Sequence, residues 1–457
     1  MSVSQSPEQK LASFVVQTKW ANLPARAVEN AKNAVLDSIG ICLAGSVEDT
    51  GRIVIETARE VGAQNISGVI GGGLRTSPEL AALANGTMTH ALDYDDVSDS
   101  WIGHPSTVLV PAILAMAEKC HSSGREIITS YVTGFEVGAK LGLACGQDQY
   151  ARGWHNTGTI GSVAGAAAIA RLLKLDATKT QMAMGIAASL AGGLRENFGS
   201  MTKPLHAGNG ARNAVLAGLL AEKGFTSSEN ALTGKAAFAR VFGQDHDYDF
   251  AAVFSQLGSP FDIISPGIWV KAYPSGAVTH SAISAAVKLR QEHSFDLKEV
   301  VEIKCATNPA VPKIIIHHHP KTGLEGKFSL EYCVSVALLD GEVSLDSFTD
   351  RRAGQDDVQG FMSKIKYVHP PELENKFGFN VPGIVTVVMK NGRELTGRVD
   401  SPKGTPANPM TQAELQGKFE NCARRVLSAE KTKQVIREVG RLEQMKNVSD
   451  LINIMLG

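Results

Sequence analysis

The sequence predicts a mainly α-helical protein, with a large all-α domain built from both chain ends and a smaller inserted α+β lid domain. Three observations support this fold class. Apolar residues recur at helical spacing up to about residue 265. β-Branched runs appear after Pro266, and helical patterns return after the Pro/Gly-rich segment SPKGTPANPM. The expected domains are therefore 1–266, 267–400 and 401–457, with the last rejoining the first.

The first part of the chain is expected to fold as a series of closely packed helices. One begins near Pro24, and another has Ser77 as its N-cap and Pro78 in its first turn, which is a strong start signal. Alanine and glycine dominate the apolar faces, so neighbouring helices can approach closely. Further helices are expected at 106–121, 125–145, 158–173, 178–193, 207–223 and 247–257.

The inserted part combines short strands with helices. Asn391-Gly392, between two alternating apolar runs, is a strong hairpin signal. After the Pro/Gly segment, Thr411 and Glu414 have the spacing of a capping box and begin the helical tail. The expected strands are 300–308, 364–370 and 383–400, and the expected helices are about 278–292, 327–340 and 353–363.

The composition is that of a globular protein. The chain has 457 residues, 43% of them hydrophobic and 20% charged, with a net charge of −1. This balance gives no reason to expect nucleic acid as a partner, and no apolar run is long enough for a membrane span. Six cysteines stand singly, and the first ten residues lack a secretory pattern. We therefore expect reduced, buried thiols and a cytoplasmic protein.

The stretch GWHNTGTIGSVAGAAAIA places His155 directly before a helix rich in glycine and alanine. The histidine either caps a core helix or is presented by the helix to a site. The stretch THALDYDDVSDSWIGHPS adds His104 and, if its helix continues, sets His90, Asp93 and Asp96 on one face. Its spacing leaves open solvated or capping acids, a metal-free catalytic cluster and a divalent metal site, although no H-E-x-x-H pattern is present.

Two later stretches carry cations beside expected helix starts. Lys203 and His206 precede a helix rich in Gly, Ala and Asn, an arrangement that can hold a carboxylate; an exposed basic loop is the alternative. Lys271 precedes a Tyr-Pro-Ser-Gly turn, and His280 lies in the first turn of the next helix, where a structural role is the alternative.

Two further candidates are weaker. The segment HHHP at 317–320 resembles a metal site, but three adjacent side chains in a loop do not easily converge on one ion. Tyr332 can act as an acid, although its apolar helix favours a place in the core.

Taken in order, HALDYDD, GHPS, GWHNTGTIG, MTKPLHAGNGARN, KAYPSGAVTH and KFSLEYCVSVALLDGEVSL resemble motifs of the MmgE/PrpD family. The resemblance spans nearly the whole chain. This family contains 2-methylcitrate dehydratase, cis-aconitate decarboxylase and iminodisuccinate epimerase. The resemblance implies the same helical domain and lid, a homodimer, and a reaction that needs no metal or organic cofactor.

These activities all move a proton beside a carboxylate and stabilise the negative charge that develops. The resemblance implies that His155 and His280 transfer protons, and that Asp93 positions a neighbouring histidine or lysine. The implied catalytic residues are His155, His280, Asp93, Lys203 and Tyr332, and the implied substrate-binding residues are His104, Lys271 and His206.

The leading hypothesis is therefore a cofactor-independent lyase that decarboxylates or dehydrates a small di- or tricarboxylate. An isomerase that epimerises an acidic dicarboxylate such as iminodisuccinate is the main alternative. A metal-dependent hydratase using His90, Asp93 and the histidines at 317–319, and a non-catalytic carboxylate-binding protein, are two others. Val97 stands where the family's decarboxylases often carry Thr, and Gly276 stands where the family often has Cys. These two departures leave the substrate open.

Overall fold

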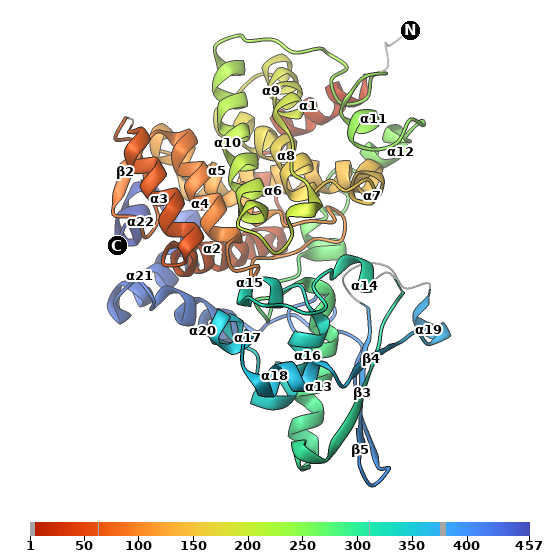
Figure 1. Ribbon diagram of the computed structural model, residues 1–457. Helices are drawn as coiled ribbons and strands as arrows, with labels where there is room; N and C mark the ends of the chain where they lie inside the picture. The colour runs from red at the N-terminus through yellow and green to blue at the C-terminus, as the bar shows by residue number, and fades with distance from the viewer. Residues whose placement is uncertain (1–4, 63, 310, 375–380) are drawn as a thin grey trace.

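The computed structural model describes residues 5–62, 64–309, 311–374 and 381–457, so part of the N-terminal segment discussed above lies outside it. Figure 1 shows a helical body and, below it, a smaller lid with a sheet. The chain leaves the body near residue 270 and returns as helices, drawn in blue, that lie against the red and orange helices of the N-terminal part. The mainly α fold class with a smaller sheet-containing part is confirmed.

The body consists of helices and one short antiparallel hairpin. This hairpin pairs β1 (Ser67–Val69) with β2 (Leu74–Thr76) and is not among the elements expected from the sequence. The helices are α1 (Pro7–Gln17), α2 (Ala25–Ser46), α3 (Asp49–Val61), α4 (Pro78–His90), α5 (Ser106–Cys120), α6 (Gly124–Leu141), α7 (Gln147–Ala151), α8 (Asn156–Leu172), α9 (Ala177–Leu190), α10 (Thr202–Glu222), α11 (Phe238–Phe242), α12 (Phe250–Phe254), α20 (Gln412–Ala423), α21 (Ala429–Gly440) and α22 (Ser449–Met455).

The lid contains a four-stranded sheet in the order β4-β3-β5-β6. The expected hairpin is present between β5 and β6, and Gly392 has the positive φ of +81° that its turn requires. The lid elements are α13 (His280–Glu292), β3 (Val300–Ala306), α14 (Val311–Ile314), α15 (Gly323–Gly326), α16 (Leu330–Asp340), α17 (Asp350–Ala353), α18 (Asp356–Met362), β4 (Ile365–Val368), α19 (Pro371–Glu374), β5 (Gly383–Met389) and β6 (Glu394–Val399).

Small residues let α4 and α10 cross at backbone contact. A Cβ atom built on Gly208 of α10 would lie 2.3 Å from the carbonyl oxygen of Leu83 and 2.2 Å from Oγ1 of Thr87, both on α4. Neither distance is tolerable, so glycine is required for this approach. The crossing matters because α4 ends at His90 and α10 carries Lys203 in its first turn.

The C-terminal helices complete the core of the body. Leu415, Phe419 and Leu451 belong to the same buried cluster as residues of α2 and α5. Lys418 pairs with Asp37 of α2 at 2.7 Å, and its ammonium group also donates to the carbonyl oxygen of Tyr94 at 2.9 Å. The tail therefore supports the loop that follows α4.

Two properties of the described residues bear on the earlier expectations. None of their helices combines the length and hydropathy that a bilayer crossing requires. All six cysteines are free thiols, and five are buried as expected, whereas Cys120 at the end of α5 is exposed.

Candidate active site

The site is built on the loop that follows α4. The helix ends at His90, and the chain turns at Asp93, whose φ of +50° is left-handed. The condition under which His90, Asp93 and Asp96 would share one helix face is therefore not met. Farther on, Val97 exchanges backbone hydrogen bonds of 2.8 and 2.9 Å with Trp269, which joins this loop to the segment leading into the lid.

Asp93 is held between two buried lysines. The ammonium group of Lys203 contacts Oδ1 directly, and that of Lys271 lies 3.2 Å from Oδ2 and donates to the Asp93 carbonyl oxygen at 2.8 Å. Burial alone would raise the pKa of Asp93, but the two ammonium groups hold it far below its usual value. Burial lowers the pKa of Lys203, and the Asp93 carboxylate opposes this effect. Asp93 therefore holds the Lys203 ammonium group in a fixed position.

Asp95 binds two histidines at once. Nδ1 of His90 lies 2.9 and 3.0 Å from its carboxylate oxygens, and Nδ1 of His104 lies 3.1 Å from Oδ2. The His104 Nδ1 also contacts the carbonyl oxygen of Asp96 at 3.0 Å. Because all these partners are acceptors, each Nδ1 carries the proton. Burial lowers the pKa of His90 to about 3 and also lowers that of His104, so both rings are neutral at pH 7.

His155 is presented by the start of α8, as the sequence predicts. It stands just before the first residue of the helix, and its backbone N–H donates to the Gly193 carbonyl oxygen at 2.9 Å. Its Nδ1 lies 3.2 Å from Nδ1 of His206 on α10. Burial and the Lys203 charge lower the pKa of His155 well below its usual value, and the same causes lower that of His206 to about 4. Both rings are neutral, so one of the two Nδ1 atoms donates to the other.

A small, partly open cavity of about 40 Å³ lies between the body and the lid. Phe198 of the body and Phe328 of the lid form part of its wall, and the Lys203 ammonium group lies 5.1 and 4.7 Å from their ring centres. Cation–π contacts of this kind favour the charged lysine. Other lining residues are Asp93, Ile102, Gly103, His104, Tyr150, His155, Gly276, Ala277, Val278, Ile314 and Ile315.

Four of the eight candidate residues line the cavity: Asp93, His104, His155 and Lys203. Lys271 and His206 lie one layer behind, in contact with Asp93 and His155 respectively. The expectation that Lys203 and His206 precede a helix is wrong, because α10 begins at Thr202 and contains both.

His280 and Tyr332 are not among the lining residues. His280 is fully buried between the rings of Trp269 and Tyr273, with centroid distances of 5.3 and 5.2 Å, and its Nε2 lies 3.3 Å from the Ser275 carbonyl oxygen. The Tyr332 hydroxyl donates to the Ser347 carbonyl oxygen at 2.6 Å inside the lid core.

The sequence analysis grouped Asp96 with His90 and Asp93 but did not single out Asp95, the carboxylate that contacts both histidines. Asp96 accepts the backbone N–H of Ser106 at 3.1 Å, and burial raises its pKa to about 8, which keeps it protonated at pH 7. His90, Asp95 and His104 lie close together in the sequence, but their contacts could be predicted only if the turn at Asp93 were known.

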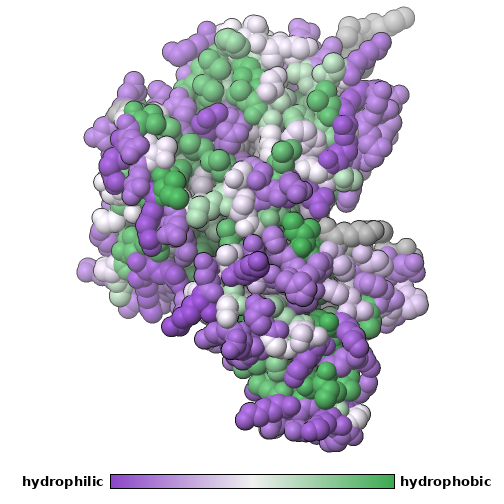
Figure 2. Space-filling view, in the orientation of Figure 1, coloured by the Kyte–Doolittle hydropathy of each residue, from purple (hydrophilic) through white to green (hydrophobic). Residues whose placement is uncertain are grey.

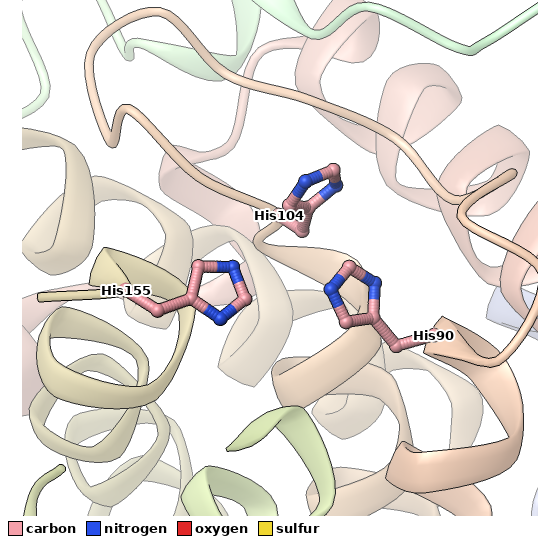
Figure 3. A group of neighbouring side chains, drawn as sticks. All are labelled: His90, His104 and His155. Atoms are coloured by element: carbon pink, nitrogen blue, oxygen red, sulfur yellow. The ribbon is translucent and has the colours of Figure 1, made fainter. Parts of the chain in front are cut away.

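The described residues contain two groups that could hold a metal ion. One is His90, His104 and His155, whose nearest nitrogen atoms lie within 4.8 Å of one another; the other replaces His155 by Asp93 and Asp95. Figure 3 shows the three imidazole rings of the first group arranged around one space. The HHHP histidines do not join them: His317 contacts the Phe198 carbonyl oxygen at 3.2 Å, and His318 contacts Glu331 at 2.8 Å.

Comparison with known proteins gives consistent matches along the chain. The model of the MmgE/PrpD N-terminal domain matches residues 9–251, and that of the MmgE/PrpD C-terminal domain matches residues 273–444. A cis-aconitate decarboxylase-like protein of Aspergillus oryzae is 28% identical over 98% of this chain and 97% of its own length. The cis-aconitate decarboxylase of Homo sapiens is 27% identical over 99% and 95%. A 2-methylcitrate dehydratase of Cupriavidus necator is 23% identical over 85% and 84%.

Proposed function

Because the chain belongs to the MmgE/PrpD family, we propose that it is a lyase that acts on a small tricarboxylate, and specifically that it decarboxylates cis-aconitate or a close analogue. The decarboxylase relatives cover both chains more completely than the dehydratase does, which supports decarboxylation over dehydration. The names of these relatives give no support to the epimerase alternative.

One observation carries the proposal. The ammonium group of Lys203 lines a small cavity together with the imidazoles of His104 and His155. A carboxylate seated on Lys203 would be bound by a charge that Asp93 holds in place. The imidazoles supply groups that can take up and release a proton once the negative charge of a bound substrate opposes the lowering of their pKa values by burial.

In the proposed reaction, the bond between a carboxyl carbon and its neighbour breaks and CO₂ leaves. The electron pair stays on the carbon skeleton, conjugated with the double bond and a remaining carboxylate, and Lys203 stabilises this charge. One proton is then added at carbon, so a trianion plus one proton gives a dianion plus CO₂. His155 is the proposed donor, since a bound trianion favours its protonated form.

The neighbouring candidate residues would support Lys203 and His155 rather than carry the reaction themselves. Asp93 and Lys271 would hold Lys203 in position, and His206 would accept from His155 Nδ1 or donate to it. His280 and Tyr332 stay predicted as catalytic residues. For either residue to contact the substrate, the wall of the cavity would have to rearrange. Each side chain is hydrogen-bonded to the backbone carbonyl oxygen of a residue that does not line the cavity.

We also propose that the enzyme is a cytoplasmic homodimer that works without a metal or organic cofactor. The free cysteines support a reducing compartment. An apolar groove lies between α9, α10 and the segment that follows α10, and large hydrophobic side chains are exposed there. This exposure supports a second copy of the chain as the partner that covers the groove.

The test is proton NMR of EDTA-treated protein in deuterated buffer with cis-aconitate, 2-methylcitrate or citrate. We expect cis-aconitate to give a new unsaturated dicarboxylate carrying one deuteron, with release of CO₂. Loss of water from 2-methylcitrate would instead establish a dehydratase. Deuterium exchange without loss of CO₂ or water would indicate an isomerase, and silence with all three substrates would contradict the proposal.

Lys203→Met supplies the residue-level test, because methionine keeps the length of the side chain and removes its charge. We expect kcat/KM to fall by about 10²–10³-fold, the scale for loss of one preorganised electrostatic group. Lys223→Met, at the exposed C-terminal end of the same helix, is the matched control and should behave like the unmodified protein. Equal activity in both variants would remove Lys203 from the mechanism.

A further inference from the structure

We propose that His90, His104 and His155 form a binding site for a divalent transition-metal ion of the zinc class, and that this ion inhibits the enzyme by competing with substrate. The ion is an inhibitor in this proposal, so the reaction itself needs no metal. Binding of the ion is independent of the proposed function, whereas the inhibition rests on it.

Two of the three histidines are already prepared as metal ligands. Asp95 accepts the Nδ1 protons of His90 and His104, which leaves the Nε2 atom of each neutral ring with a lone pair. A carboxylate behind a ligating histidine is the usual arrangement in zinc sites, where it fixes the tautomer and raises ligand basicity. The His90 Nε2 is buried and has no hydrogen-bond partner among the described residues. An unpaired buried acceptor of this kind costs free energy that a metal ion would recover.

His155 completes the set. When its Nδ1–H donates to Nδ1 of His206, its Nε2 is left with a lone pair. The ring of His155 lies 5.6 Å from that of His90 and 6.2 Å from that of His104, measured between centroids. Figure 3 shows that these rings come from three separate segments and surround one space.

The distances require a small adjustment. The nearest nitrogens lie within 4.8 Å of one another, whereas a tetrahedral ion with Zn–N bonds of about 2.0–2.1 Å needs them about 3.4 Å apart. Rotations of the imidazole rings bring the atoms together, and the fourth position takes water. Three neutral imidazoles suit zinc, cobalt, nickel or copper, whereas Mg²⁺ and Ca²⁺ prefer oxygen ligands.

Competition follows from the overlap of the two sites. His104 and His155 line the cavity that the substrate would fill. An ion on their nitrogens occupies that space and prevents His155 from taking up a proton. Zinc is therefore expected to raise the apparent KM and to leave kcat unchanged at saturating substrate.

The experiment measures zinc binding directly, by equilibrium dialysis of the EDTA-treated protein with free Zn²⁺ fixed by a chelator buffer. We expect one ion per chain, and a Co²⁺ adduct with the intense visible bands of a tetrahedral site. His90→Gln should weaken binding at least tenfold. His319→Gln, which changes an exposed histidine, is the matched control and should bind as the unmodified protein does. If His90→Gln does not fold, His155→Gln replaces it.

Kinetic assays at fixed free Zn²⁺ then test the inhibition. The expected pattern is competitive with substrate, reversed by EDTA and not reproduced by Mg²⁺. Absence of a bound ion, or binding that is unchanged in both His90→Gln and His155→Gln, would overturn the site. Activation by zinc would overturn the inhibitory role, whereas an inactive protein that still binds one zinc would count against the proposed function alone.

Discussion

Asp93 shows how one residue combines backbone geometry with charge. Its φ of +50° is a conformation that aspartate tolerates better than most L-residues. The turn directs its carboxylate to Lys203 and Lys271, which come from α10 and from the segment before the lid. A single loop residue therefore joins two cations that lie far apart in the sequence.

Buried histidines predict how stability depends on pH. Burial lowers the pKa of His90 and His280 to about 3 and that of His206 to about 4, whereas an unfolded histidine titrates near 6.5. Below about pH 6.5 the unfolded chain binds protons that the folded chain excludes, so stability is present above that pH and falls as the pH is lowered. Each such histidine contributes up to about 1.4 kcal/mol per pH unit.

We therefore expect Tm to fall steadily between pH 7 and pH 5 in a thermal scan. His280→Gln should show a shallower decline, because one of these groups is gone. His319→Gln, an exposed histidine, should keep the slope of the unmodified protein. A Tm that stays constant over this range would show that these histidines are protonated in the folded state.

At the scale of single residues, local sequence patterns predicted some features of the site and its surroundings but not the contacts between side chains. The place of His155 before α8 followed from a local pattern, and so did the capping pair Thr411 and Glu414. The binding of both His90 and His104 by Asp95 could not be predicted, because it depends on the turn at Asp93 and on how the loop folds back over itself.

Among the elements, α4 and α10 position the site through their close crossing. Gly208→Ala would force a Cβ against Leu83 and Thr87 of α4. Overpacking of this kind costs about 1–3 kcal/mol and shifts the helices apart. Because α10 carries Lys203, we expect both a lower Tm and a lower kcat, measured by thermal scanning and steady-state kinetics.

Gly417→Ala in α20 is the control for this prediction. No atom would lie within 4 Å of the new Cβ, so the change should stabilise the helix by about 0.5–1 kcal/mol. Retained activity and an unchanged Tm in Gly208→Ala would mean that the crossing tolerates a methyl group.

Periodicity predicted the existence of most elements and was less accurate at their ends. The predicted helix at 207–223 begins five residues earlier, because Thr202 to His206 also belong to it. Pro204 does not prevent this, since it lies within the first turn, where proline is tolerated. The short hairpin of β1 and β2 was missed because each strand has only three residues, too few for an alternating pattern.

At the scale of the whole molecule, the surface predicts self-association. Figure 2 shows hydrophobic side chains over the upper part of the body, where Figure 1 places α9 and α10. Phe225 and Val241, which line the groove there, are 57% and 53% exposed. Such a patch favours a second copy, since symmetric dimers are the commonest oligomers.

Light scattering after size-exclusion chromatography should therefore give a mass of about 97 kDa, twice the 48.5 kDa of the chain. Phe225→Glu should shift the mass toward the monomer, because it places a charge in the groove. Ile53→Glu on α3, 54% exposed outside the groove, should leave the mass unchanged. A monomer in the unmodified protein would contradict the proposed dimer.

The position of Lys418 has a consequence for synthesis. This residue of α20 ties Asp37 to the carbonyl oxygen of Tyr94, within the loop that carries Asp93 and Asp95. At about 5–20 residues per second, translation takes on the order of 20–60 s to advance from Asp95 to Lys418. During this interval the residues of the lid are synthesised, while the loop still lacks the contact with Lys418. In a ribosome-bound chain, the loop that carries the candidate site therefore stays without this support until α20 has been synthesised and has packed against α2.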